Sequence, residues 1–418
     1  MTTDRRHRDW RSTVALLLAA LACCALSATA GAAATTGDAP RVQPGIEVLL
    51  HDRLDLIRGK GVGLITNPTG VNPDLVSDID LLAHVPGVHL VALFGPEHGI
   101  RGAHQAGATV GSFRDPATGL PVYSLYGKTR EPTPAMLKGV NVLVFDIQAV
   151  GARFYTFLYT MADAMKAAAR AHIPIIVLDR PNPIGGTLVQ GPVLEPPFAS
   201  FVGQYPIPLR YGMTIGELAE LFNSEFHIGA DLTVVKMRGW KRSMDYRATH
   251  LPFVIPSPNM PTPATALVYP GMGLVEGTNV SEGRGTTLPF QLTGAPWIDA
   301  GQLAQKLNDQ HLPGVRFRPA HFTPTFSKYQ GKLCNGVEVF VMDRETFNPV
   351  IVGLTVIKAI HDLYPDQFHF IASDFDRLVG NAWIREDIEE GVPVSAMRER
   401  WQKRLSQFKK TRRGYLLY

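Results

Sequence analysis

Four short, predominantly apolar segments constrain the fold of this chain more than any other feature of its sequence. These are residues 62–66, 88–94, 140–145 and 173–178. Each is followed by a loop rich in glycine, proline and polar residues, and short runs of this kind are typical of strands buried on both faces of a parallel sheet. Between the last two, residues 154–171 carry an apolar face at helical spacing. The alternation of strand and helix predicts an α/β fold.

The pattern changes towards the second half of the chain. Thr214 and Glu217 form a predicted capping box at the start of a helix. The proline-rich residues 255–263 predict a rigid connector, because proline cannot donate a ladder hydrogen bond. Further on, alternating strands and helices capped by Asp299 and Asn348 predict α+β structure. We therefore expect a parallel-sheet domain at residues 46–260 and an α+β domain at residues 261–418.

The N-terminus has the pattern of a secretory signal, residues 1–34, followed by a flexible leader, residues 35–45. Basic residues precede an apolar run and small residues that offer cleavage after Ala30 or Ala34. The run is too short for a comfortable membrane span. A lipoprotein signal at Cys23 and twin-arginine export are weaker alternatives. We expect an exported protein, periplasmic or extracellular, with no stable membrane insertion after cleavage.

Composition sets broad limits on what the chain does. Hydrophobic residues make up 45% and charged residues 19% of its 418 residues, as in a globular protein. The formal net charge of +4 comes largely from the two ends, including a predicted basic helix at residues 396–410. Such a helix can contact nucleic acid or an anionic envelope, but a solvated helix face is the simpler explanation. We expect no nucleic-acid partner, and the oligomeric state is open.

Polar side chains follow each of the four predicted strands. They are Asn67 and Thr69; Glu97, His98 and Arg101; Asp146, Gln148, Arg153 and Tyr155; and Asp179, Arg180 and Asn182. Because the carboxyl ends of parallel strands share one edge, these sets are expected to converge on a small-molecule site. A glycine-rich stretch at residues 269–287 adds Glu276, Asn279, Glu282 and Arg284. A polar glycine-rich loop can cradle a phosphate or a sugar.

Glu97 is the leading catalytic candidate. It lies in the sequence Gly-Pro-Glu-His-Gly-Ile-Arg-Gly of residues 95–102. Partial desolvation at an apolar sheet edge favours the protonated form of a carboxyl group, as a general acid requires. The alternative is an ion pair with Arg101 that holds the loop. Asp146 has two interpretations as well, a second catalytic carboxylate or a helix N-cap.

Several common active sites are missing from the sequence. It has no G-x-S-x-G nucleophile elbow, no H-E-x-x-H and no Cys/His cluster for zinc. Gly59, Gly61 and Gly63 precede a strand, whereas a dinucleotide-binding fingerprint follows one. We therefore expect no metal and no cofactor.

Seven stretches together resemble the exo-β-N-acetylmuramidases of the NamZ type, formerly a domain of unknown function. They are residues 61–70, 94–102, 144–155, 179–186, 210–214, 256–261 and 277–287. The resemblance covers about residues 45–418. It implies a Rossmann-like N-terminal domain, a smaller C-terminal auxiliary domain and an active site in the cleft between them. It also implies release of N-acetylmuramic acid from the non-reducing ends of peptidoglycan fragments, without NAD.

The resemblance also implies roles for single residues. The catalytic glutamate of the family falls on Glu97 as general acid, and Asp146 and Glu282 are the leading candidates for the second carboxylate. The substrate-binding positions would be Asn67, His98, Arg101, Arg153, Tyr155, Asn182, Glu276, Asn279 and Arg284. Ala149 departs from the family pattern, where a polar residue is expected. The alternative function is a non-catalytic envelope protein that binds peptidoglycan fragments in the same cleft; an envelope esterase or amidase is disfavoured by the missing elbow.

Overall fold

The computed structural model describes residues 41–101 and 111–418, and residues 41–418 belong to one compact unit. The predicted signal peptide and residues 35–40 of the leader lie outside the described residues, whereas residues 41–45 of the leader are described. Within the described part, no helix has the length and apolar character needed to cross a membrane.

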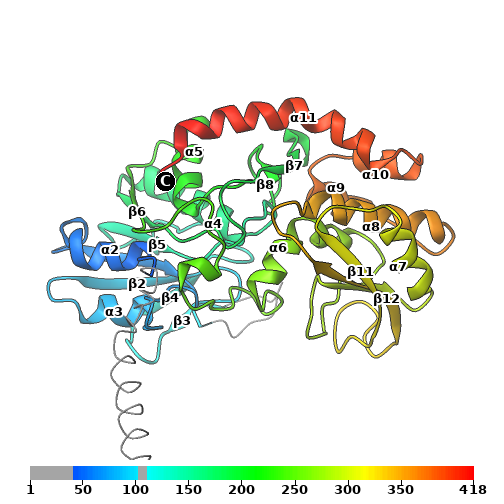
Figure 1. Cartoon of the computed structure of the whole chain (residues 1–418). Coiled ribbons are helices and arrows are strands. Elements are labelled where there is room, and N and C mark those ends of the chain that lie inside the picture. Colours follow the sequence, from blue (N-terminus) through cyan, green and yellow to red (C-terminus); the bar gives the residue numbers. More distant parts are fainter. Residues whose placement is uncertain (1–40, 102–110) are drawn as a thin grey trace, which may run out of the picture. The chain divides into compact units, whose positions relative to one another are not determined.

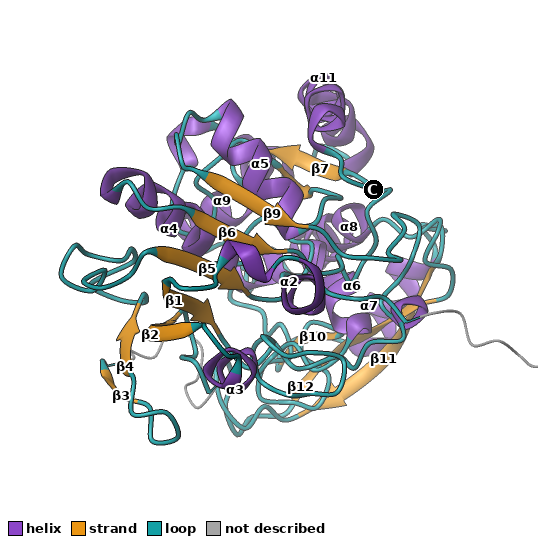
Figure 2. Ribbon diagram, turned by 90° about the vertical axis from the view of Figure 1, so that its left-hand side faces the viewer, coloured by secondary structure: helices purple, strands orange, loops and turns teal. Residues whose placement is uncertain are grey.

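A seven-stranded, mostly parallel sheet forms the core of the N-terminal half (Figures 1 and 2). Its strands are β1 (Gly61–Thr66), β2 (His89–Gly95), β3 (Phe113–Arg114), β4 (Pro121–Ser124), β5 (Val142–Asp146), β6 (Ile175–Leu178) and β9 (Leu232–Val235). Their spatial order is β3-β4-β2-β1-β5-β6-β9, and β3 alone pairs antiparallel. The four strands predicted from apolar segments are confirmed as β1, β2, β5 and β6.

The order of the parallel strands reverses between β1 and β5. Counted along the chain, the six parallel strands lie in the order 3-2-1-4-5-6. In open sheets of this kind, ligands bind outside the carboxyl ends of the strands, near the point of reversal. The loops after β1, β2 and β5 are therefore the part of the fold where a site is expected.

Helices cover both faces of this sheet (Figure 2). Along β5, Leu143 and Phe145 pack towards α4 (Phe157–Ala171) and α5 (Ile215–Glu225). Val142 and Val144 pack towards α2 (Gly45–Asp52) and α3 (Asp78–His84). Successive side chains of a strand point to opposite faces, so a strand covered on both sides is apolar throughout, as the sequence indicated.

Of two predicted helix starts, the structure confirms one and moves the other. The capping box is formed: Thr214 accepts from the backbone of Glu217, whose side chain accepts from the backbone of Thr214. By contrast, α4 begins at Phe157, three residues later than the apolar pattern predicted. The chain turns before the helix can begin: Ala152 bridges Arg210, Arg153 N donates to Leu209 O at 2.9 Å, and residues 153–154 form a turn.

The C-terminal half is built on a three-stranded antiparallel sheet in the order β10-β12-β11. Its strands are β10 (Leu292–Ala295), β11 (Val315–Phe322) and β12 (Cys334–Val341). Helices in this half are α6 (Pro263–Met272), α7 (Ala300–Asn308), α8 (Pro349–Leu363), α9 (Ala372–Val379), α10 (Trp383–Glu389) and α11 (Val394–Thr411). The predicted N-caps Asp299 and Asn348 are confirmed.

Shorter elements complete the described fold. A two-stranded sheet pairs β7 (Gln190–Val193) with β8 (Pro208–Arg210). The 3-10 helices are η1 (Leu54–Leu56), η2 (Pro196–Phe198), η3 (Arg247–Thr249), η4 (Gly273–Gly277) and η5 (Arg412–Tyr415). Helix α11 returns from the C-terminal half to pack against β7 (Figure 1).

The proline- and glycine-rich stretches are more regular than the sequence indicated. The predicted connector ends in helix α6, with Thr262 as N-cap and Pro263 in the first turn, a position that proline favours. Tyr269, at the start of the predicted polar loop, is in this helix, and Glu276 is in η4. Both residues are therefore held on helical backbone.

Candidate active site

A cavity of about 190 Å³ lies beyond the carboxyl ends of β2 and β4. Its wall is rich in aromatic rings: Tyr126, Phe154, Tyr155, Phe157, Phe201 and Tyr269. Its polar members are Glu97, His98, Thr156, Ser257, Glu276 and Arg284. Four other hollows, of about 240, 380, 270 and 260 Å³, are larger. We favour this smaller cavity because it combines two carboxylates with many aromatic rings, as sites for small polar ligands do.

A tight turn after β2 holds Glu97. Gly99 N donates to Pro96 O at 2.9 Å and closes the turn. His98 and Gly99 both have positive φ, 72° and 74°. A non-glycine residue in this region costs about 1 kcal/mol or more, and such strain is concentrated at functional sites. The two positive φ values and the Gly99 hydrogen bond thus define the turn that carries Glu97.

Two hydroxyl groups contact the Glu97 carboxylate. Thr156 Oγ1, just before α4, donates to Glu97 Oε2 at 2.8 Å. Burial, the negative charge of Glu97 and a hydrogen bond to its carboxylate together raise the pKa of Tyr126 to about 12. The Tyr126 hydroxyl therefore stays protonated at physiological pH and acts as a donor.

Glu276 and Arg284 form a second polar group in the same cavity. Arg284 Nε donates to Glu276 Oε1 at 2.7 Å, and Arg284 Nη2 bonds the same oxygen. Glu276 Oε2 accepts no hydrogen bond from the residues that the structure describes. Burial raises the pKa of the Glu276 carboxyl, Arg284 opposes that shift, and the charge of Glu282 adds to it.

Two tyrosines lie within electrostatic reach of both polar groups. Burial raises the pKa of Tyr155 and of Tyr269 well above the ordinary range, and both hydroxyls sense Glu97 and Arg284. The Tyr155 side chain is 7% exposed, and its hydroxyl makes no hydrogen bond of ordinary geometry with the described residues. Ser257 lies close enough to lower the Tyr155 pKa slightly. A buried, unsatisfied hydroxyl at a cavity wall is a natural partner for a polar ligand.

Glu282 lies behind the cavity wall. Its carboxylate accepts from Lys328 Nζ at 3.1 Å and lies 3.4 Å from Arg284 Nε. Lys328 also donates to three backbone carbonyls of this segment, those of Val275, Glu276 and Val280. The Glu282 side chain is 3% exposed. Lys328 thus links Glu282 to the segment that carries Glu276.

Asp146 is in a buried ion cluster at the ends of β1 and β5. Arg180 Nη2 donates to Asp146 Oδ2 at 2.9 Å, and Arg180 lies 3.7 Å from Asp78. Burial and the charge of Asp146 raise the pKa of Asp78 well above its usual range. This cluster lies where the strand order reverses, and none of its residues lines the cavity that holds Glu97.

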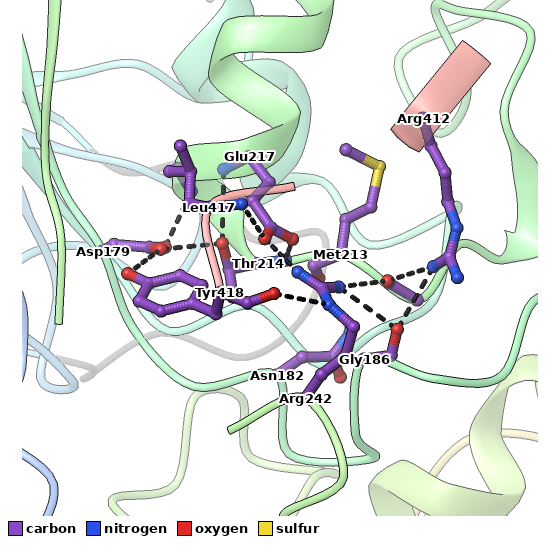
Figure 3. Close-up of polar contacts among 12 residues, drawn as sticks. Asp179, Asn182, Gly186, Met213, Thr214, Glu217, Arg242, Arg412, Leu417 and Tyr418 are labelled. Carbon is purple, nitrogen blue, oxygen red and sulfur yellow. Dashed lines mark hydrogen bonds and ion pairs between the residues drawn. The ribbon is translucent and has the colours of Figure 1, made fainter. Parts of the chain in front are cut away.

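Asp179 is the corresponding carboxylate after β6 (Figure 3). It accepts from Thr214 Oγ1 and Tyr418 Oη, both at 2.7 Å, and from Gly216 N at 2.8 Å. Burial raises its pKa to about 7, against the opposing effect of these hydrogen bonds. Asp179 therefore joins β6, the start of α5 and residue 418.

The remaining predicted residues are also outside the cavity. Asn67 bonds Thr69, Asn182 bonds Met213 and Ile184, and Asn279 bonds Gln367 and His369. Arg153 is fully buried and donates to the carbonyls of Pro192, Ile207 and Leu378. Arg101 pairs with Asp115 at 3.2 Å rather than with Glu97.

The structure thus brings together part of the predicted set. Glu97, His98, Tyr155, Glu276 and Arg284 line one cavity. The sequence analysis did not single out Tyr126, Thr156, Ser257 or Tyr269. Thr156 directly follows the stretch at residues 144–155. Ser257 lies within residues 256–261, and Tyr269 begins the glycine-rich stretch at residues 269–287. No sequence pattern pointed to Tyr126. Among the described residues, no group of three or more His, Cys, Asp or Glu side chains is arranged to bind a metal ion.

Comparisons with known proteins cover nearly the whole described chain. Residues 62–264 match the family model for the N-terminal part of exo-beta-N-acetylmuramidase NamZ, and residues 267–418 match the model for its C-terminal part. A protein of Bacillus subtilis (strain 168), described as peptidoglycan beta-N-acetylmuramidase NamZ, is 60% identical over 395 residues, which cover 94% of this chain and 95% of the relative.

Two crystal structures of DUF1343 family proteins from Bacteroides fragilis NCTC 9343 are similar in fold. The first has a TM-score of 0.86 and 44% identity, covering 90% of this chain and 99% of its own. The second has a TM-score of 0.74 and 34% identity, covering 91% and 99%.

Proposed function

We infer that this chain, which belongs to the exo-beta-N-acetylmuramidase NamZ family, is an exo-acting glycosidase that releases N-acetylmuramic acid from the non-reducing ends of peptidoglycan fragments. The relative of 60% identity carries the corresponding name. The observation that carries this inference within the structure is the aromatic cavity that contains both Glu97 and Glu276. Hydrolysis of a glycosidic bond ordinarily uses two carboxyl groups and a site that holds one sugar ring.

Glu97 is the proposed general acid. Its carboxyl group lines the cavity, and the hydroxyls of Thr156 and Tyr126 fix its orientation. In that role, Glu97 gives its proton to the glycosidic oxygen as the bond to the leaving sugar breaks. The protonated Tyr126 hydroxyl then stabilises the carboxylate that remains.

Glu276 is the proposed second carboxylate. One of its oxygens is held by Arg284, and the other accepts no hydrogen bond from the described residues. A carboxylate held in this way can stabilise positive charge at the anomeric carbon or activate water. We prefer Glu276 to Asp146 and Glu282, because those two carboxylates are almost fully buried in ion pairs.

We propose further that the central sheet is of the Rossmann-like type. The strand order 3-2-1-4-5-6 is the order of that fold class. The α+β part from residue 261 is then the auxiliary domain, which contributes Tyr269, Glu276 and Arg284 to the cavity. Export to the periplasm or the cell exterior remains a proposal based on the N-terminal sequence.

Product analysis tests this function directly. The mature protein is incubated with defined muropeptides and with the disaccharide of N-acetylmuramic acid and N-acetylglucosamine, and the products are identified by mass. We expect free N-acetylmuramic acid to appear from the non-reducing end. Binding of the fragments without any product after long incubation would support the alternative, a non-catalytic envelope protein.

A further inference from the structure

The three arginines predicted to bind the substrate already have protein partners in the structure. N-acetylmuramic acid differs from N-acetylglucosamine by a lactyl ether that ends in a carboxylate, so a muramidase needs a cation near the sugar. Arg101 is paired with Asp115, and Arg153 is buried among carbonyls. Arg284 is in the cavity but is neutralised by Glu276 and Glu282.

Arg130 contacts an aromatic ring that lines the same cavity. Its guanidinium carbon is 4.3 Å from the ring centre of Phe201, which lines the cavity. The ring of Phe201 is in turn 6.2 Å from that of Tyr126, the hydroxyl partner of Glu97. The charge of Arg130 also lowers the Tyr126 pKa against the effect of burial. Arg130 therefore acts on the Glu97 side of the cavity.

The surroundings of Arg130 leave its charge uncompensated. The side chain is exposed, and no carboxylate of the described residues forms an ion pair with it. Its neighbour Glu131 pairs with Arg170 at 2.8 Å instead. A guanidinium stacked on an aromatic ring is fixed in orientation, while the N–H groups at its edge stay available for bidentate bonding to a carboxylate.

We propose that Arg130 binds the lactyl carboxylate of the substrate and thereby selects N-acetylmuramic acid over N-acetylglucosamine. This inference rests on the proposed function, since it names the residue that recognises the distinguishing group of that substrate. Phe201 positions the guanidinium, and Glu97 acts on the glycosidic oxygen of the same sugar.

The test is a pair of substrates that differ only in this charge. They are the p-nitrophenyl β-glycoside of N-acetylmuramic acid and the same glycoside with its lactyl carboxylate converted to the methylamide. In Arg130→Met we expect kcat/KM for the acid to fall about 10- to 100-fold, mainly because KM rises. A loss of this size is typical when a hydrogen bond between charged groups is removed. The methylamide should change by less than about 3-fold.

Lys128→Met is the matched control. Lys128 is an exposed cation on the same loop, and it makes no cation-π contact in the described structure. We expect it to retain the kinetics of the wild type on both substrates. If Lys128→Met lost as much kcat/KM on the acid as Arg130→Met, the loss would come from the overall positive charge of the loop. If Arg130→Met lost equal kcat/KM on both substrates, the loss would come from a change in the protein structure. Either result, or an unchanged Arg130→Met, would overturn the inference.

Binding separates this inference from the proposed function. Calorimetry with free N-acetylmuramic acid needs no turnover, and Arg130→Met should weaken that binding about 10-fold or more without affecting N-acetylglucosamine. If the wild type binds the sugar acid through Arg130 but hydrolyses nothing, the glycosidase function fails and the carboxylate site stands. If it hydrolyses the substrate and binds equally well without Arg130, the carboxylate site fails.

Discussion

Carboxylates at the strand ends have different surroundings although they occupy similar positions. Glu97 reaches the cavity from the turn after β2. Asp146 and Asp179, at the ends of β5 and β6, are fully buried and are held by Arg180 and Thr214, respectively. A strand-end carboxylate is thus a site candidate from the sequence alone, and its partners decide whether it reaches a ligand.

Substitution of Asp146 tests whether this residue stabilises the fold or takes part in catalysis. Asp146→Asn leaves Arg180 with Asp78 as its remaining carboxylate, at 3.7 Å. Loss of one partner of a buried ion pair costs about 3 kcal/mol or more, so the free energy of unfolding in urea should fall by about that amount. The folded variant should keep kcat within about 3-fold, because Asp146 is outside the cavity. A kcat loss of 100-fold or more at unchanged stability would show that Asp146 is catalytic after all.

The raised pKa of the Asp179 carboxyl makes the free energy of unfolding depend on pH. Its pKa is about 7 in the folded protein, above the value of about 3.9 expected when unfolded. Between these values the folded state holds a proton that the unfolded state releases, so stability falls as pH rises from about 4 to about 7. From pH 5 to pH 7.5 the wild type should lose about 2 kcal/mol of unfolding free energy relative to Asp179→Asn.

The control for this experiment is an exposed aspartate. Asp366→Asn changes a side chain without an ion pair in the described structure, and it should leave the pH profile of urea unfolding unaltered. A profile for Asp179→Asn that runs parallel to the wild type would contradict the assignment.

At the scale of elements, helix α6 carries one wall of the cavity and is in backbone contact with α8. A Cβ atom at Gly271 would lie 1.7 Å from the carbonyl oxygen of Pro349, and one at Gly353 would lie 2.3 Å from that of Gly271. Both positions therefore require glycine. Because Tyr269 is on α6, this contact fixes the aromatic wall of the cavity as well as the fold.

Substitution of Gly271 tests this contact. Gly271→Ala should push α6 away from α8 and lower the free energy of unfolding by about 2 kcal/mol or more, as overpacking does. Turnover should fall with it, because Tyr269 moves. Gly301→Ala is the matched control in α7, where the nearest atom to a new Cβ is 3.4 Å away. The control should be neutral or slightly stabilising, and equal stability of both variants would argue against the contact.

At the scale of the molecule, the sequence predicted the layers of the fold better than the composition of the site. Apolar runs identified β1, β2, β5 and β6 because both faces of the sheet are covered. Capping residues located the starts of α5, α7 and α8. Helix α6 was missed, since its prolines and glycines obscure helical spacing and its stability comes from packing on α8.

The cavity draws on segments from Glu97 to Leu378 that are far apart in the chain. Polar motifs identified Glu97, His98, Tyr155, Glu276 and Arg284. The same reasoning could not distinguish these cavity residues from Asp146, Arg153 and Glu282, which lie outside the cavity. Those three side chains are held by partners that can be distant in the sequence, up to 225 residues away for Arg153. Tyr126 and Phe201 were beyond prediction, as tertiary packing alone brings them to the cavity.

The central claim is that Glu97 donates a proton to the leaving sugar. The decisive measurement compares Glu97→Gln with the wild type on two substrates, the disaccharide of N-acetylmuramic acid and N-acetylglucosamine and the p-nitrophenyl glycoside of N-acetylmuramic acid. The control is Glu131→Gln. Glu131 is on the loop after β4 and its carboxylate pairs with Arg170. Urea unfolding verifies that each variant is folded.

General acid catalysis contributes about 10²- to 10⁴-fold, so kcat of Glu97→Gln on the disaccharide should fall by at least about 100-fold. The loss should be smaller on the p-nitrophenyl glycoside, because p-nitrophenolate leaves without a proton. Near-normal turnover of the disaccharide by folded Glu97→Gln would contradict the account.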